Sequence, residues 1–140
     1  MRTVLKEGGV YVLRFDPGEE LVSGLAAFCK ESAVPAAWIS AIGGVREATL
    51  AFYNIESKQY EDREFRELLE IVGCSGNASR SENSEIILHV HGVFSRPDGE
   101  TIGGHIKKAV ISATCEVRLE CFLRPITKRK DGATGLMLME

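Results

Sequence analysis

The sequence contains no long apolar segment. No stretch approaches the roughly 18 uninterrupted apolar residues that a membrane-spanning helix needs. Residues 1–7 reach charged side chains within a few positions, so they lack the apolar core of a secretion signal. These two absences predict a soluble, cytoplasmic protein that has no contact with a membrane.

An excess of positive charge is also lacking. The chain carries 17 Lys and Arg residues against 20 Asp and Glu residues, which gives a formal net charge of -3. Proteins that bind a phosphate backbone through their overall field need the opposite sign, so the composition does not support nucleic-acid binding. The one basic cluster, residues 128–130, is followed by Asp131 and Gly132, a pattern typical of the solvated tip of a hairpin.

Paired cysteine motifs are absent as well. The four cysteines are scattered without any Cys-x-x-Cys pair, and a chain of 140 residues can bury one core without disulfide bonds. We expect the cysteines to be reduced and to act as small buried side chains. Because no repeat or linker interrupts the chain, one domain over residues 1–140 is predicted.

A strand and then a helix are predicted in the first quarter of the chain. Val10–Phe15 is dense in β-branched and aromatic residues, which favours a strand. Asp16, Pro17 and Glu19 follow in the pattern of a helix start, with Asp16 as the capping residue. Apolar residues then recur at helical spacing until about Ser32.

Beyond this helix the pattern is that of a sheet, so the sequence predicts an α+β domain. Gly43-Gly44 suggests a bend or bulge within a long strand pair made by residues 38–42 and 48–53. A polar loop at residues 79–84 precedes the most strand-like run, residues 86–94, and Pro97-Asp98-Gly99 predicts a turn. Residues 58–63 and 68–74 are predicted to form another strand pair, although residues 64–71 could instead begin a helix. Further strands are predicted at residues 113–123 and 136–139.

The three histidines lie close together in the sequence. His89 and His91 are two positions apart in a predicted strand, so their imidazoles point to the same face. The turn at residues 97–99 reverses the chain, and His105 lies on the returning segment. Three neutral imidazoles would leave one position of a tetrahedral zinc site open. Two alternatives follow: one shared site for a divalent metal such as zinc, or three separate polar residues on a half-solvated strand.

Several motifs resemble the PPC (plant and prokaryote conserved) domain family. They span nearly the whole chain: Trp38–Gly43, Glu70–Asn77, Leu88–Gly92, Asp98-Gly99, Gly103–His105 and Glu116-Val117. The resemblance implies an α+β fold with a central antiparallel sheet, one main packed helix and assembly into a homotrimer. It also implies that the three histidines are zinc ligands.

Simpler roles are expected for the residues around these motifs. We expect Gly103-Gly104 to let the backbone bend so that His105 turns toward the other histidines. Gly73 and Gly76 are expected to mark a bulge or a tight subunit contact. Asn77 is expected to make local hydrogen bonds rather than to bind a ligand.

Three functions remain open. The first is a zinc-binding homotrimeric module that recognises a small anionic ligand or a protein partner. The second is a zinc-dependent hydrolase or lyase that activates water. Its candidate general acid or base is Glu116, whose strand context equally suits a solvent-facing residue. The third is a DNA-binding or transcription-associated protein, by analogy with plant family members. This chain lacks their AT-hook, so that function would need a basic face assembled by trimerisation from Lys107, Lys108 and residues 128–130.

Overall fold

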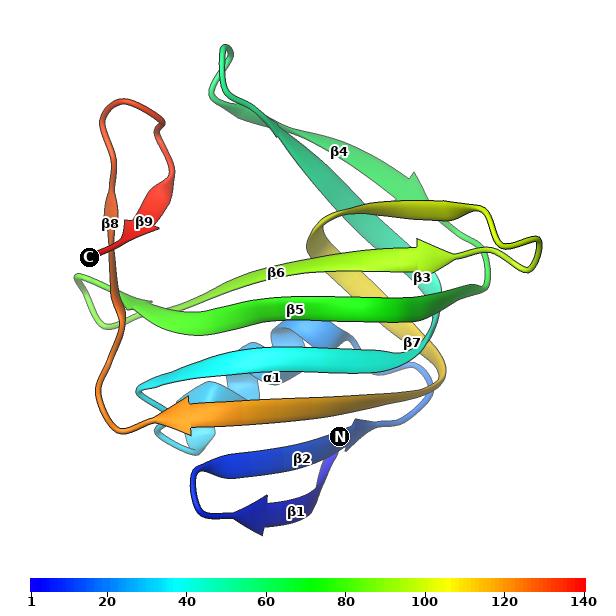
Figure 1. The fold of residues 1–140 in the computed structure, drawn as a ribbon, viewed down its shortest axis with the longest axis horizontal. Coiled ribbons are helices and arrows are strands. Elements are labelled where there is room, and N and C mark those ends of the chain that lie inside the picture. Colours follow the sequence, from blue (N-terminus) through cyan, green and yellow to red (C-terminus); the bar gives the residue numbers. More distant parts are fainter.

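The computed structural model describes residues 1–140 as one helix and a nine-stranded sheet (Figure 1). The elements in chain order are β1 (Arg2–Glu7), β2 (Val10–Phe15), α1 (Leu21–Glu31), β3 (Ala36–Asn54), β4 (Gln59–Phe65), β5 (Leu69–Ser81), β6 (Ile86–Ser95), β7 (Thr101–Phe122), β8 (Thr127–Lys130) and β9 (Met137–Met139). The main path through the sheet is β1-β2-β7-β3-β5-β8-β9, with β4 beside β3 and with β6 paired to β5 and β7. Only the pairing of β5 with β8 is parallel.

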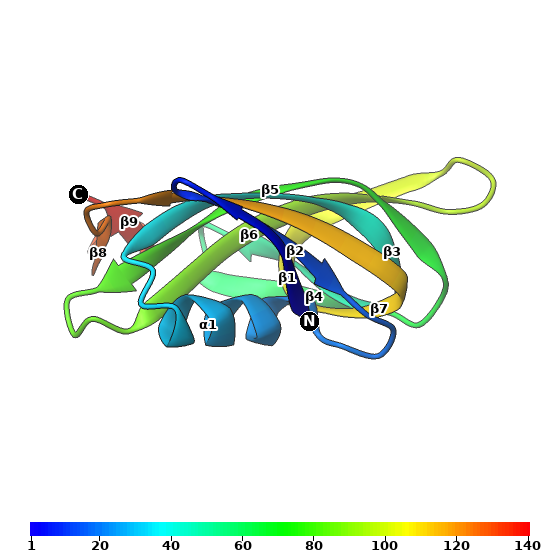
Figure 2. The ribbon, with the colours of Figure 1, turned by 90° about the horizontal axis from the view of Figure 1, so that it is seen from below.

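The long strands β3 and β7 close part of the sheet on itself. β3 pairs with both β5 and β7, and β6 joins β5 to the first part of β7, so these four strands form a ring. Figure 2 shows α1 in the hollow of the curved sheet. Between them lies a core of 25 buried residues, in which Phe15, Leu25 and Phe94 are fully buried.

The expectation of an α+β domain holds only in part. A helix does pack on a largely antiparallel sheet, but strands hold 65% of the residues and the helix only 8%, so the domain is mostly β. The long strands β3 and β7, with 19 and 22 residues, raise the strand content above the expectation, because the sequence pattern divided each of them into shorter strands. The chain contains no helix with both the length and the apolar character needed to cross a bilayer.

The predicted start of the helix is wrong by four residues. Glu20, rather than Asp16, is the N-cap, and its two carboxylate oxygens accept hydrogen bonds from the backbone N–H groups of Val22 and Ser23 at 3.0 and 2.6 Å. Asp16 belongs to a turn that continues through Gly18, whose φ of 88° suits glycine. The predicted end is confirmed, since α1 stops at Glu31 with Ser32 as its C-cap.

Most of the predicted strands are confirmed, but their connections differ. β2 coincides with the predicted strand 10–15, and β3 is one long strand whose pairing with its neighbours shifts register around Gly43. β4 and β5 begin one residue later than the predicted strands 58–63 and 68–74, so the alternative helix at residues 64–71 is wrong. However, β4 and β5 do not pair with each other, because both pair with β3.

Three other boundaries also differ from the prediction. β7 runs without a break from Thr101 to Phe122, where the sequence suggested two strands. β5 extends to Ser81, so the predicted polar loop is shorter than residues 79–84. β1 was not predicted from the sequence, whereas β9 matches the edge strand expected near residues 136–139.

The basic cluster is a solvated hairpin tip only in part. Residues 128–130 end β8 and lead into the turn toward β9, and Arg129 and Lys130 are exposed. Arg129 pairs with Glu82 at 2.8 Å. Lys128, however, is only 2% exposed. As expected, all four cysteines are free thiols, and three of them are buried.

Candidate metal centre

His89 and His91 lie on the face of β6 that is turned away from the core. Alternate residues of a strand point to opposite faces. Val90 and Phe94 are buried in the core cluster, so the two histidines between and beside them point outward, and both are exposed. The prediction that the two imidazoles share a face is confirmed.

The third histidine joins them through strand pairing. After the turn that contains Gly99, β7 returns beside β6, and His105 becomes the direct partner of His91. One ring nitrogen of each histidine lies within 4.8 Å of those of the other two. The closest pair is Nε2 of His89 and Nε2 of His91, at 3.0 Å. The structure therefore brings together all three histidines that the sequence singled out.

Close packing of the neighbouring strands fixes this arrangement. A Cβ atom on Gly76 would lie 2.2 Å from the backbone oxygen of His89, so only glycine lets β5 approach β6 this closely. A Cβ atom on Gly104 would lie 2.9 Å from the backbone oxygen of Ala51. The expectation that Gly103 and Gly104 bend the chain is therefore wrong. Both lie within the continuous strand β7, where they let its backbone approach the neighbouring strands closely.

Burial and mutual repulsion keep at least two of the imidazoles neutral. Burial lowers the pKa of His105 to about 4, with added repulsion from His89 and His91. Burial also lowers the pKa of His89, and the nearby charge of Lys128 adds to this effect. Neutral imidazole is the form that binds a metal, so these two rings are ready to act as ligands at neutral pH.

The three rings fit a tetrahedral zinc ion. With Zn–N bonds of about 2.0–2.1 Å, the ligand nitrogens of such a site lie roughly 3.3 Å apart. The 3.0 Å between His89 and His91 is close to this spacing, and the 4.8 Å limit on the remaining distances is within reach of small ring rotations. In addition, Nδ1 of His105 is buried and has no hydrogen-bond partner in the chain. Such a buried orphan nitrogen needs an explanation, which a bound cation would supply.

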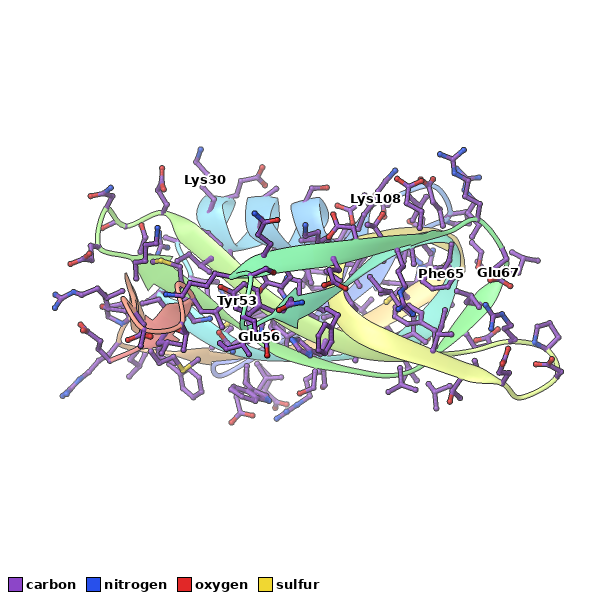
Figure 3. All side chains as sticks on the ribbon, turned by 90° about the horizontal axis from the view of Figure 1, so that it is seen from above. Lys30, Tyr53, Glu56, Phe65, Glu67 and Lys108 are labelled. Carbon is purple, nitrogen blue, oxygen red and sulfur yellow. The ribbon has the colours of Figure 1, made fainter.

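Two hairpins stand beside the centre. The ring of Tyr60, on β4, lies 5.1 Å from that of His105, and Tyr53 on β3 packs against Tyr60. The hydroxyl of Tyr53 donates a hydrogen bond to the backbone oxygen of Thr134 at 2.6 Å, which ties the β3–β4 hairpin to the β8–β9 hairpin. Figures 1 and 3 show the tip of the first hairpin, near Tyr53 and Glu56, next to β8 and β9.

Two residues beside the histidines were not predicted from the sequence. Asn77 on β5 is the direct strand partner of His89, is 5% exposed, and its Oδ1 is buried without a hydrogen-bond partner. Its side chain therefore does not make the local hydrogen bonds that the sequence suggested for that oxygen. Lys128 on β8 is buried, and its charge acts on both His89 and His105. Its place in the basic cluster gave no signal of burial.

Glu116 is not brought to the histidines. It lies exposed on β7, paired with Arg14 and Ile42, and it borders a shallow hollow of about 390 Å³ on the outer face of the sheet. The path from its segment of β7 to His91 crosses β3, β5 and β6. Three inter-strand spacings amount to about 14 Å, so Glu116 stands apart from the candidate metal centre.

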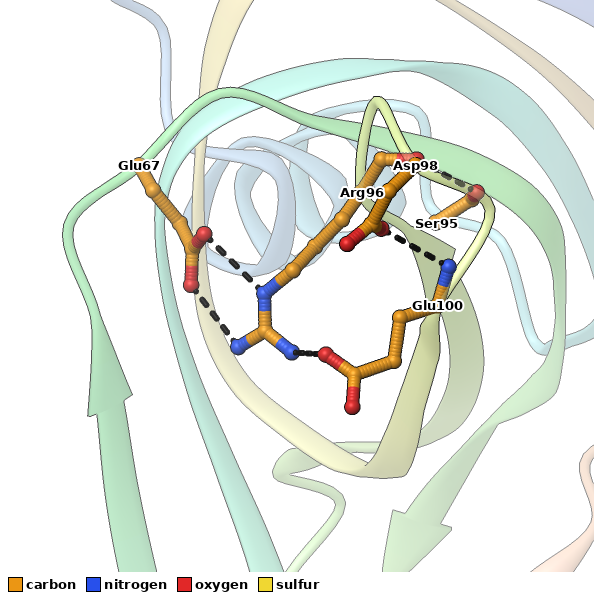
Figure 4. A network of polar contacts seen from close by, with 5 residues as sticks. All are labelled: Glu67, Ser95, Arg96, Asp98 and Glu100. Carbon is orange, nitrogen blue, oxygen red and sulfur yellow. Dashed lines mark hydrogen bonds and ion pairs between the residues drawn. The ribbon is translucent and has the colours of Figure 1, made fainter.

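Most of the basic side chains named for a DNA-binding face are paired or buried, and only Lys130 is exposed without an ion pair. Arg96, which was not among those named, is paired as well. In the turn after β6, its guanidinium donates hydrogen bonds to both carboxylate oxygens of Glu67, at 3.0 and 3.1 Å, and also contacts Glu100 (Figure 4). Lys107 pairs with Asp62 at 2.7 Å, and Lys108 pairs with Glu47 at 2.8 Å. These ion pairs neutralise the charges that a phosphate backbone would need.

Comparison with known proteins gives matches over most of the chain. The model of the Plants and Prokaryotes Conserved (PCC) domain matches residues 2–122. A candidate DNA-binding protein of Bacteroides thetaiotaomicron is 33% identical, with a TM-score of 0.93 over 97% of this chain and 94% of that one. The metal-containing protein AF0104 of Archaeoglobus fulgidus is 35% identical, with a TM-score of 0.87 over 100% of this chain and 99% of that one.

Two curated relatives are much longer proteins. The bifunctional protein GlmU of Synechococcus sp. strain JA-3-3Ab is 31% identical over 131 residues, which cover 91% of this chain and 20% of that protein. GlmU of a second Synechococcus strain gives a similar match, at 28% identity. The chain thus spans about a fifth of the length of the curated relatives it matches.

Proposed function

Because the chain belongs to the Plants and Prokaryotes Conserved domain family, we propose that it is a zinc-binding, homotrimeric, cytoplasmic domain that recognises a small anionic ligand or a protein partner. The observation that carries this proposal is the convergence of His89, His91 and His105 within 4.8 Å. The similar protein AF0104 is itself metal-containing, which adds support for a metal.

The chemistry of the ligand set favours zinc. The group consists of three imidazoles without a carboxylate, and imidazole suits zinc, whereas calcium and magnesium prefer oxygen ligands. With three protein ligands, zinc would leave one position free and would act there as a Lewis acid on a bound oxygen. Burial lowers the pKa of His89 and His105, so both imidazoles are neutral at neutral pH and could bind the ion.

Metal analysis of protein purified without a chelator tests the proposal. We expect one zinc ion per wild-type chain and less than a fifth of that in His89→Ala, by elemental analysis. Thr101→Ala is the matched control, because Thr101 is exposed on β7, four residues before His105. Wild-type protein that stays free of zinc after equilibration with a zinc salt would refute the proposal.

An exposed apolar face supports the proposed homotrimer. Trp38 and Ile42 on β3, Val72 on β5 and Val93 on β6 are between 47% and 59% exposed. Their strands are neighbours in the sheet, with β3 paired to β5 and β5 to β6. Contiguous exposed apolar side chains of this kind mark protein–protein contacts, and a second and third copy of the chain would cover them.

A charge placed on this face should dissociate the trimer. Light scattering coupled to gel filtration should give three times the chain mass of 15.3 kDa for the wild type, and a smaller mass for Ile42→Glu. Ile55→Glu is the matched control, since Ile55 is 55% exposed against 58% for Ile42 but lies in the turn between β3 and β4. A monomeric wild type would refute this part of the proposal.

A zinc-dependent hydrolase or lyase is the second candidate function. It is favoured by a titratable group beside the histidines, because the ring of Tyr60 lies 5.1 Å from that of His105. Burial raises the pKa of Tyr60, which keeps its phenol protonated and able to donate a proton. We expect zinc-loaded wild type to hydrolyse an activated ester faster than His91→Ala and Tyr60→Phe. Equal rates for all three proteins would eliminate this function.

DNA binding is the third candidate, and a similar protein supports it. The relative from Bacteroides thetaiotaomicron is a candidate DNA-binding protein. The net charge of -3 and the ion pairs of Lys107 and Lys108 count against the same role here. A salt-dependent mobility shift of labelled duplex DNA by micromolar protein would establish it.

A further inference from the structure

Lys128 is a buried cation without a partner. The residue is 2% exposed, and burial alone acts on its pKa, which it lowers, with no carboxylate or hydrogen-bond partner in the chain. Lys107, by contrast, forms an ion pair with Asp62 at 2.7 Å. Taking an ammonium group out of water without pairing it is costly. A buried, unpaired lysine therefore calls for an anion that the chain itself does not provide.

The position of Lys128 directs this charge toward the candidate metal centre. β8 runs parallel to β5, with Lys128 beside Ser81 at the end of that strand. From there β8 leads to the β8–β9 turn, where the backbone oxygen of Thr134 accepts the hydrogen bond from Tyr53. Tyr53 packs against Tyr60, whose ring lies 5.1 Å from that of His105. Lys128 therefore lies on the strand that runs from the end of β5 to the side of His105, and the effect of its charge on His89 and His105 agrees with this position.

Asn77 provides a second unpartnered polar group at the same place. It is the direct partner of His89 across β5 and β6, and side chains of such pairs lie on the same face about 5 Å apart. The residue is 5% exposed, and its Oδ1 is buried without a hydrogen bond. Buried polar atoms are nearly always paired, so this amide also points to a bound group.

We propose that Lys128 and Asn77 form an oxyanion subsite beside the candidate metal centre. A small oxyanion, a carboxylate or a phosphate, would bind with its negative charge between the metal and the Lys128 ammonium. The Asn77 amide, turned about its last bond so that Nδ2 takes the buried position of Oδ1, would donate an N–H hydrogen bond to it. This inference rests on the proposed metal-binding function and names the ligand class of that site. It also explains the retention of two polar groups that otherwise destabilise the fold.

Cobalt-loaded protein provides the test, because the visible absorption of Co²⁺ changes when the groups around it change. Acetate and inorganic phosphate are titrated separately into the wild type, Lys128→Met and Asn77→Ala, after the metal content of each has been measured. Lys107→Met is the matched control, since Lys107 also lies near His105 but is paired with Asp62. We expect Lys128→Met to weaken anion binding about tenfold or more, Asn77→Ala to weaken it less, and Lys107→Met to leave it within about twofold.

The choice of anion identifies the ligand. Saturation by acetate but not by phosphate assigns a carboxylate, and the reverse result assigns a phosphate. A wild-type protein that holds its metal but shows no spectral response to either anion up to tens of millimolar would overturn the inference. Unchanged anion binding in Lys128→Met with full metal content would do the same.

Thermal melting separates a ligand role from a structural one. Without anion, Lys128→Met should melt at or above the temperature of the wild type, because it removes a buried, unpaired charge and keeps the shape of the side chain. A markedly lower melting temperature would mean that Lys128 supports the fold, and the inference would fail. If the wild type binds no metal, the proposed function fails. A Lys128-dependent rise in melting temperature on adding either anion would then support the subsite alone, and its absence would refute the subsite as well.

Discussion

Substitution of His91 by alanine should abolish stabilisation by zinc without disturbing the fold. His91 is exposed on the outer face of β6, away from the core cluster. Exposed side chains of this kind usually change the free energy of unfolding by no more than about 0.5 kcal/mol when replaced. The metal-free variant should therefore melt within about 2 °C of the metal-free wild type.

The effect of zinc on the wild type can be calculated. A ligand that binds only the native state raises the free energy of unfolding by about 2.7 kcal/mol when its concentration is about 100 times its Kd. The unfolding entropy is about 2.1 cal/mol/K per residue, which amounts to about 0.29 kcal/mol/K for a chain of 140 residues. The melting temperature of the wild type should accordingly rise by about 9 °C.

Differential scanning calorimetry with and without zinc measures this shift directly. We expect the full rise in the wild type and in Thr101→Ala, and less than about a third of it in His91→Ala at the same zinc concentration. The reasoning is refuted if His91→Ala keeps more than half of the wild-type rise, because His91 would then not be a ligand. Equal loss in Thr101→Ala would show that the β6–β7 pair as a whole is responsible, rather than one imidazole.

Three other predictions follow from the same contacts. Gly76→Ala should lower the free energy of unfolding in urea by about 2 kcal/mol or more and weaken zinc binding, because its Cβ would lie 2.2 Å from the His89 backbone oxygen. Gly73→Ala should change both quantities little, because its Cβ would have no atom within 4 Å. Metal-free protein should lose stability as the pH falls from 6.5 toward 4. Burial lowers the pKa of His105 from 6.5 to about 4, so the unfolded chain takes up the proton first. In urea unfolding at a series of pH values, the free energy of unfolding of His105→Gln should depend less on pH than that of the wild type. Labelled duplex DNA should show no mobility shift with micromolar protein at low salt, because the net charge is -3 and both Lys107 and Lys108 are paired with acids; a shift that disappears at high salt would contradict this.

The histidine site could be predicted because its geometry depends on local features. Two residues apart on a strand means one shared face, and a short turn brings the following strand back beside it. These rules place His89 and His91 on one face and allow His105 to join them, and the pairing of His91 with His105 decides between the shared site and three separate residues. The resemblance to the PPC domain family rested on motifs spread along the chain, and the family match over residues 2–122 confirms it.

Strand length and strand partners could not be predicted in the same way. Gly103 and Gly104 interrupt the hydrophobic pattern and suggest a strand end, yet β7 continues through them because β3 and β6 pack too closely for side chains there. The helix cap shifted from Asp16 to Glu20 for a related reason. The Glu20 carboxylate also accepts a hydrogen bond from the Ala109 backbone N–H, a contact with β7 that lies far away in the sequence.

The sequence by itself determined the single apolar core, the strand character of most of the chain and the shared face of the histidines, because each follows from side chains within a few positions of one another. Only the tertiary structure decided that Glu116 lies three inter-strand spacings away from the histidines, whereas Lys128 and Asn77 are buried on their side of the sheet. The burial of a lysine is set by the strands that fold over it, and a basic residue among other basic residues carries no local sign of that environment.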